Sequence, residues 1–201
     1  DRADECVMSW WRQAATPLDV YLVGQAMQTA QETWGMIHTP HPAGHRVFGY
    51  RTTEILGVVP AFALGVAKAL EDGADVIACL HDDLLIEEEA WDLKVLEAFE
   101  TNPRMGLAGF GGGCGLGAID LYRTPYSPMQ LARQDFISNM RDAEAHGRRY
   151  RDPHAVVVLD GFSQIGRASF WRGDFPTKSS GPHRFGNLFE LLQLWGMTHH
   201  A

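Results

Sequence analysis

An unbroken apolar run that ends in two carboxylates constrains this chain more than any other segment. Residues 76–80 are Val-Ile-Ala-Cys-Leu, and His81, Asp82 and Asp83 follow directly. A continuous apolar run of this length is typical of a strand that is buried on both faces, as in a parallel sheet. Open α/β sheets bind ligands beyond the carboxyl ends of their strands. We therefore expect Asp82 and Asp83 to lie at the ligand-binding edge of a sheet.

The paired carboxylates suggest a metal site. Two ionised carboxylates side by side repel each other unless a cation lies between them. Their hard oxygen atoms suit Mg²⁺ or Mn²⁺ that carries a substrate phosphate. An acidic loop that merely closes the strand would show the same pair of residues, so the spacing alone leaves both interpretations open.

Alternating strand and helix patterns predict the rest of the fold. Further strands are expected at residues 18–23, 105–110 and 155–159, and helices at residues 4–15, 60–71, 87–100, 127–146 and 186–195. Residues 35–50, which are rich in Gly, Pro and His, are expected to form a loop. This alternation predicts an α/β protein, a single domain over residues 1–201, with a mostly parallel sheet and helices on both of its faces.

Composition limits the class of protein. The chain has 201 residues, of which 45% are hydrophobic and 21% charged, as in globular proteins. No apolar run approaches the roughly 20 residues of a membrane span, and no signal segment is expected at the start. Its three cysteines are widely spaced. Such cysteines predict free thiols in a reducing compartment, and hence a cytoplasmic protein.

Charge is distributed unevenly along the chain. Residues 1–122 carry 18 acidic and 7 basic side chains, whereas residues 123–201 carry 7 acidic and 10 basic ones. Arg148, Arg149 and Arg151 form the densest basic cluster. This asymmetry suggests two faces with different partners, although basic side chains also favour an ordinary helix C-terminus.

Several further residues are candidates for the site, each with a structural alternative. Asp160 ends a second apolar strand and is either a general base, an anchor for an acceptor hydroxyl, or the cap of a turn at Gly161. Glu190 is either a base that reaches the cleft or an exposed helix residue. His199 and His200 are either metal ligands or part of a terminal tail.

A glycine-rich stretch, residues 111–117, follows the strand expected at residues 105–110. It lacks the helix that would make it a dinucleotide-binding loop, because Pro125 and Pro128 come soon after it. A glycine loop beside the acidic strand end lets the backbone approach a sugar or a phosphate closely, and a turn that requires positive φ is the alternative. We expect the backbone of Gly111 and Gly112 to contact the ligand.

The order of these segments resembles the GT-A glycosyltransferases, which use nucleotide sugars, and in particular their large inverting family. That family has an Asp-x-Asp or related acidic motif at a strand end and, later, a strand that ends in an Asp-Gly step. The matching segments here are Gly57-Val58-Val59-Pro60-Ala61, the motif His81-Asp82-Asp83, the strand at residues 106–112 and Val157-Val158-Leu159-Asp160-Gly161.

The resemblance implies roles for residues 1–122, the half that would bind the nucleotide sugar. Asp83 looks like the ligand of a divalent ion, Mn²⁺ or Mg²⁺, that bridges the donor diphosphate. Asp82 and His81 would lie at the donor, which is expected to be a UDP-sugar. Gln25 stands where the family has an aspartate that binds the donor. The family usually begins with a strand that contacts the nucleobase, and this chain is expected to begin after it.

The same resemblance assigns residues 123–201 to the acceptor. Gly161 and the three arginines would contact it, and either Asp160 or Glu190 would deprotonate its hydroxyl group. Because this half is basic, an anionic acceptor such as modified DNA is one expectation, and a saccharide or a lipid-linked acceptor is another. Two other functions stay open, namely a nucleotidyltransferase that makes sugar nucleotides and a non-catalytic protein that binds them.

Overall fold

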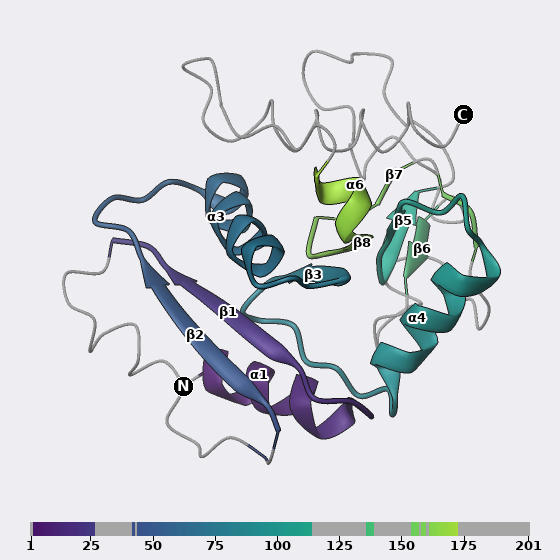
Figure 1. Ribbon diagram of the computed structural model, residues 1–201, viewed down its shortest axis with the longest axis horizontal. Helices are drawn as coiled ribbons and strands as arrows, with labels where there is room; N and C mark the ends of the chain where they lie inside the picture. The colour runs from purple at the N-terminus through teal and green to yellow at the C-terminus, as the bar shows by residue number, and fades with distance from the viewer. Residues whose placement is uncertain are drawn as a thin grey trace, which may run out of the picture.

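The computed structural model describes residues 2–26, 42, 44–113, 136–138, 154–156, 158–159 and 161–172. Within them the helices are α1 (Arg2–Gln13), α3 (Val58–Glu71), α4 (Trp91–Thr101) and α6 (Ala168–Arg172). The strands are β1 (Asp19–Gly24), β2 (Arg46–Arg51), β3 (Val76–Leu80), β4 (Leu107–Ala108), β5 (Gly111–Gly113), β6 (Phe136–Ser138), β7 (Val158–Leu159) and β8 (Ser163–Arg167). Figure 1 shows their arrangement, and the mixed α/β class predicted from the sequence is confirmed.

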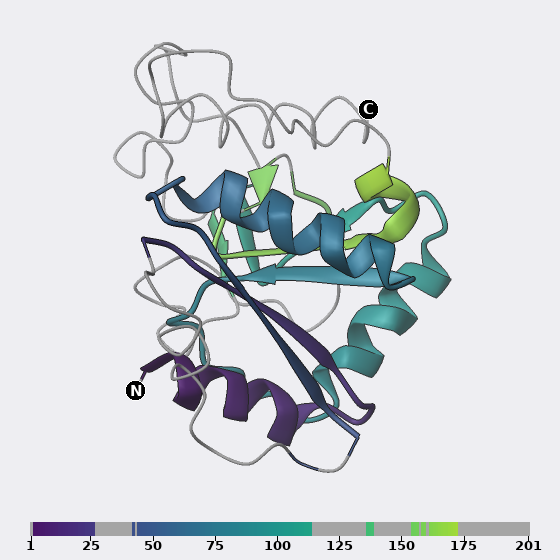
Figure 2. The same cartoon turned by 60° about the vertical axis from the view of Figure 1, so that its left-hand side comes forward.

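Helices cover both sides of β3, as expected. Ile77 and Cys79 face one hydrophobic cluster, which contains residues of α3 and α6. Val76 and Leu80 alternate with them and pack against a second cluster, built largely from α1 and α4. Figure 2 shows α3 on one side of β3 and α1 on the other. The strand is therefore sandwiched, although Ala78 at its centre is exposed.

The pairing of the strands differs from the expected mostly parallel sheet. Among the strands that the structure describes, β1 and β2 are parallel. β8 runs antiparallel to both β3 and β4, and β5 runs antiparallel to both β6 and β7. Short apolar runs predict burial but not direction, which explains the error. Because β3 and β4 flank the same antiparallel strand, they run in the same direction.

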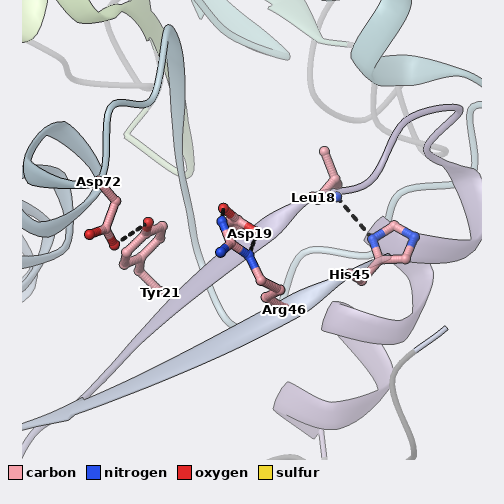
Figure 3. A network of polar contacts seen from close by, with 6 residues as sticks. All are labelled: Leu18, Asp19, Tyr21, His45, Arg46 and Asp72. Carbon is pink, nitrogen blue, oxygen red and sulfur yellow. Dashed lines mark hydrogen bonds and ion pairs between the residues drawn. The ribbon is translucent and has the colours of Figure 1, made fainter. Parts of the chain in front are cut away.

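The prediction of a loop over residues 35–50 is wrong at its end, where strand β2 pairs in parallel with β1. Val20 lies opposite Val47 in the register, and both are buried. Figure 3 shows the polar contacts along this pair: Arg46 donates to Asp19 (Nε to Oδ1, 2.7 Å), and the Tyr21 hydroxyl donates to Asp72 at 2.8 Å. The sequence of β2, Arg-Val-Phe-Gly-Tyr-Arg, does not alternate between apolar and polar residues, so no period of two indicated a strand.

The predicted helix at residues 87–100 begins later, at Trp91. The three glutamates therefore precede the helix and do not form its first turn. Contacts with α1 fix the start: the backbone N–H of Ala90 donates to the carbonyl of Gln13 at 2.7 Å, and the Trp91 indole donates to the carbonyl of Trp10 at 3.1 Å. Ala90 takes a left-handed conformation, with φ of 53°. Tertiary contacts thus override the local preference of the glutamates.

Two predictions for segments that follow β4 are wrong where the structure describes them. The helix expected at residues 127–146 is replaced at Phe136–Ser138 by strand β6, which pairs with β5. The glycine run begins as strand β5, not as a loop, at Gly111–Gly113. The helix expected at residues 186–195 lies outside the described residues.

Within the described residues, the strands expected at residues 105–110 and 155–159 are present only as the two-residue strands β4 and β7, and the helices expected at residues 4–15 and 60–71 are confirmed. Helices α1 and α3 lie where the apolar periodicity placed them, and Gly73 (φ 85°) follows the end of α3 as its stop signal. Cys79 is a buried free thiol, and burial raises its pKa to about 12. Within the ranges that the structure describes, no helix has the length and apolar character needed to cross a membrane.

Candidate functional site

The acidic residues lie in a tight turn directly after β3. The backbone N–H of His81 donates to the carbonyl of Phe162 at 3.1 Å, which extends the pairing of β3 with β8 by one residue. The N–H of Leu84 then donates to the carbonyl of His81 at 3.2 Å and closes the turn. Asp82 and Asp83 occupy its two central positions, and both are exposed. The predicted strand end with two carboxylates is therefore present.

His81 is the third polar side chain of this acidic turn. Its Nδ1 atom lies 4.0 Å from Oδ1 of Asp83, and its ring lies 6.0 Å from that of Phe62 (centroid to centroid). Its Nε2 atom is buried and has no hydrogen-bond partner within the described part of the chain. Buried polar atoms without a partner are uncommon and call for an explanation such as a role in binding.

The start of β8 brings a second segment to this edge. Leu80, the last residue of β3, lies opposite Ser163 in the register, and Gly161 is buried in the turn before it. Ser163 is itself fully buried, and its Oγ atom accepts the N–H of Phe110 at 2.8 Å. The ends of β3 and β4 and the beginning of β8 therefore meet at one rim.

Gly109 shows how closely these segments approach. A Cβ atom at this position would lie 2.5 Å from the carbonyl oxygen of Ser163 and 3.3 Å from the side chain of Leu159. Only glycine lets the end of β4 lie against β8 here. Neither Gly109 nor Ser163 stands out in the sequence, since their contact joins segments more than 50 residues apart.

The two glycines predicted to contact the donor lie inside a sheet. Gly111 pairs with Ser138, and Gly112 pairs with Ile137 on one side and Leu159 on the other. Their backbone is thus part of a three-stranded ladder. Their contact with a donor stays a prediction.

Gln25 has a role in the described structure that the sequence did not reveal. Its Oε1 atom accepts the backbone N–H groups of Leu56 and Gly57, both at 2.8 Å, just before α3. The side chain of Gln25 therefore satisfies two backbone donors just before α3, although it lies 31 residues earlier in the sequence. A short-range capping pattern could not have indicated this contact, because the acceptor, Gln25, follows the end of β1 and lies far from α3 in the sequence.

Replacing Gln25 with alanine should lower the free energy of unfolding by about 1–2 kcal/mol, because two backbone donors lose their acceptor. Gln25→Glu is the matched control, since a carboxylate accepts the same two hydrogen bonds and its charge is favourable at a helix N-terminus. Urea denaturation at neutral pH measures both variants. Equal losses of stability for the two would contradict this capping role.

The remaining predicted site residues lie outside the described residues. They are Asp160, Glu190, Arg148, Arg149, Arg151, His199 and His200. The two neighbours of Asp160 are described: Gly161 lies in the turn before β8, and Leu159 ends β7, with its side chain close to Gly109 at the end of β4.

The donor set at the acidic turn fits a hard divalent cation. In the described segments, no group of three or more His, Cys, Asp or Glu side chains is arranged to hold a metal. Mg²⁺ needs fewer protein ligands, because it commonly binds one or two carboxylates together with substrate phosphates and water. Asp82 and Asp83 could supply those carboxylates, which suit Mg²⁺ or Mn²⁺, and the imidazole of His81 lies beside them.

Comparisons with known proteins identify no relative. No protein-family model matches the chain, and neither a curated protein nor a solved structure matches it.

Proposed function

We propose that this protein is a metal-dependent glycosyltransferase of the GT-A type that uses a nucleotide diphosphate sugar, with a UDP-sugar as the expected donor. The observation that carries the proposal is the exposed turn with Asp82 and Asp83 at the end of the sandwiched strand β3. Its position at a rim shared with β4 and β8 is the second support, since α/β proteins bind ligands at such edges.

In this proposal the acidic turn binds the donor diphosphate through Mn²⁺ or Mg²⁺. Asp83 is the main ligand and Asp82 lies at the sugar or ribose. The bound ion would neutralise the charge that develops on the leaving nucleoside diphosphate. The Nδ1 atom of His81 lies 4.0 Å from Oδ1 of Asp83 and would add a nitrogen donor beside the carboxylates.

The acceptor side is assigned from the sequence. Asp160 is the proposed base that takes the proton of the acceptor hydroxyl as its oxygen attacks the sugar, with Glu190 as the other candidate. Gly161 and the arginines at positions 148, 149 and 151 would contact the acceptor, a saccharide or modified DNA. His199 and His200 would complete the metal ligands in this proposal.

A binding experiment tests the donor and the metal together. We expect Mn²⁺ and UDP, added together at about 100 times their dissociation constants, to stabilise the fold by about 2.7 kcal/mol. For a chain of this size this corresponds to a rise in melting temperature of about 5–10 °C. Mn²⁺ alone or UDP alone should give a much smaller shift, and EDTA should abolish it.

Two comparisons sharpen this test. A panel of GDP, CDP and ADP in place of UDP identifies the base that the site accepts. Release of UDP from a UDP-sugar, followed in the same solutions, separates a transferase from a protein that only binds. If no diphosphate nucleotide shifts the melting temperature in the presence of either metal, the proposed function is wrong.

A further inference from the structure

We infer that Trp10 of α1 is a positioning residue for the acidic turn, a role that rests on the proposed function of that turn. The indole N–H of Trp10 donates to the backbone carbonyl of Leu84 at 2.7 Å. Leu84 directly follows Asp83 and closes the turn through its own N–H, which donates to His81. One side chain of α1 is thus bonded to the residue next to the proposed metal ligand.

The turn is held at both of its ends. Before the carboxylates, the N–H of His81 donates to Phe162 at the start of β8. After them, Trp10 holds the carbonyl of Leu84. Only Asp82 and Asp83 lie between these two anchors in the sequence. The direction of both carboxylates therefore depends on an anchor in β8 and an anchor in α1.

The neighbouring residue of α1 strengthens the second anchor. The Oγ atom of Ser9 accepts the N–H of Ile86 at 3.0 Å and donates to the carbonyl of Cys6 at 2.7 Å. Ser9 and Trp10 therefore bind two backbone groups of the segment that leaves the turn. Helix α1 is itself packed into the core through Trp10 and Trp11, so this anchor is part of the buried core.

Hydrogen-bond partners of this kind matter for metal sites. Groups that orient the ligands of a metal typically change affinity or activity by about 10- to 100-fold when they are removed. Trp10 does not bond to the proposed metal ligand Asp83 itself but to the backbone carbonyl of the next residue, Leu84. We therefore expect its indole N–H to affect metal affinity at the lower end of that range.

The test compares Trp10→Phe with Trp11→Phe. Both variants replace a buried indole of the same helix and the same core cluster with a smaller ring. Trp11 contacts the ring of His45, which precedes β2. The two variants should therefore lose comparable packing energy, whereas only Trp10→Phe removes the hydrogen bond to Leu84.

Two readouts distinguish positioning from general stability. In Trp10→Phe, the backbone N–H of Leu84 should exchange with solvent about tenfold faster than in Trp11→Phe, after correction for global stability. The affinity for Mn²⁺ with UDP, measured by electron paramagnetic resonance, should fall about tenfold in Trp10→Phe and stay near the wild-type value in Trp11→Phe. Ser9→Ala, which keeps both indoles, should give a smaller change in the same direction.

The outcomes separate this inference from the proposed function. If exchange at Leu84 and Mn²⁺ affinity change equally in the two tryptophan variants, Trp10 has no positioning role. Faster exchange without any change in affinity also rules out that role, since Trp10 would then be structural only. If the wild-type protein binds no Mn²⁺ with UDP, the proposed function is wrong, and exchange at Leu84 alone decides whether Trp10 holds the turn.

Discussion

Replacing Asp92 with alanine is expected to lower the free energy of unfolding by about 3–4 kcal/mol, the largest stability effect that we predict for a single polar side chain. The carboxylate is buried and accepts three hydrogen bonds from the turn after α1. These come from the N–H of Ala15 at 2.8 Å and from the N–H and hydroxyl of Thr16 at 2.9 and 2.6 Å. Alanine would leave these donors without an acceptor.

Two milder variants measure how much of this lost stability comes from individual hydrogen bonds. Asp92→Asn keeps one carbonyl oxygen and should cost less than Asp92→Ala, and Thr16→Val removes only the 2.6 Å hydroxyl bond and should cost about 1 kcal/mol. Urea denaturation at pH 7 measures all three. A loss below about 1 kcal/mol for Asp92→Ala would contradict the proposed role of this carboxylate in joining α1 to α4.

The contribution of Asp92 should also depend on pH. Burial alone would raise its pKa, but hydrogen bonds from Thr16 and from the backbone of residues 15, 16 and 93 hold the pKa below its usual value. A lowered pKa in the folded state stabilises the protein fully above the pKa of an unfolded aspartate, about 4. The stability difference between wild type and Asp92→Asn should therefore shrink as the pH falls below about 4.

The contrast between α1 and α4 shows what sequence patterns could predict. Both helices were expected from apolar periodicity, and both exist. The predicted start of α4 was wrong by four residues, because contacts of Ala90 with α1 and of Asp92 with the turn after α1 determine where that helix begins. Such contacts join residues about 77 positions apart, and no local pattern records them.

The same distinction applies to the candidate site. The carboxylates at the end of β3 were predicted because an apolar run and its terminal acids are contiguous in sequence. The close approach of Gly109 to Ser163 and the anchor from Trp10 to Leu84 were missed, since both depend on how distant segments pack. Strand direction was missed for the same reason, because the antiparallel return of β8 between β3 and β4 follows from topology and not from composition.

Asp83→Asn is expected to slow the release of UDP from a UDP-sugar by about 100-fold or more, equivalent to about 3 kcal/mol of transition-state stabilisation. The neutral amide keeps the shape of the side chain but loses the charge that would bind Mn²⁺. The side chain of Asp83 is 52% exposed, so the free energy of unfolding should change by no more than about 0.5 kcal/mol. An activity loss without a stability loss would therefore report on chemistry.

A matched variant removes the same charge a few residues away. Glu89 is exposed and lies in the segment between the acidic turn and α4. Glu89→Gln should leave the rate and the affinity for Mn²⁺ unchanged, because its carboxylate belongs to neither the turn nor the rim. If Asp83→Asn is as active as Glu89→Gln, the acidic turn does not bind the metal. The strand end that dominates the sequence would then be an exposed loop without a catalytic role.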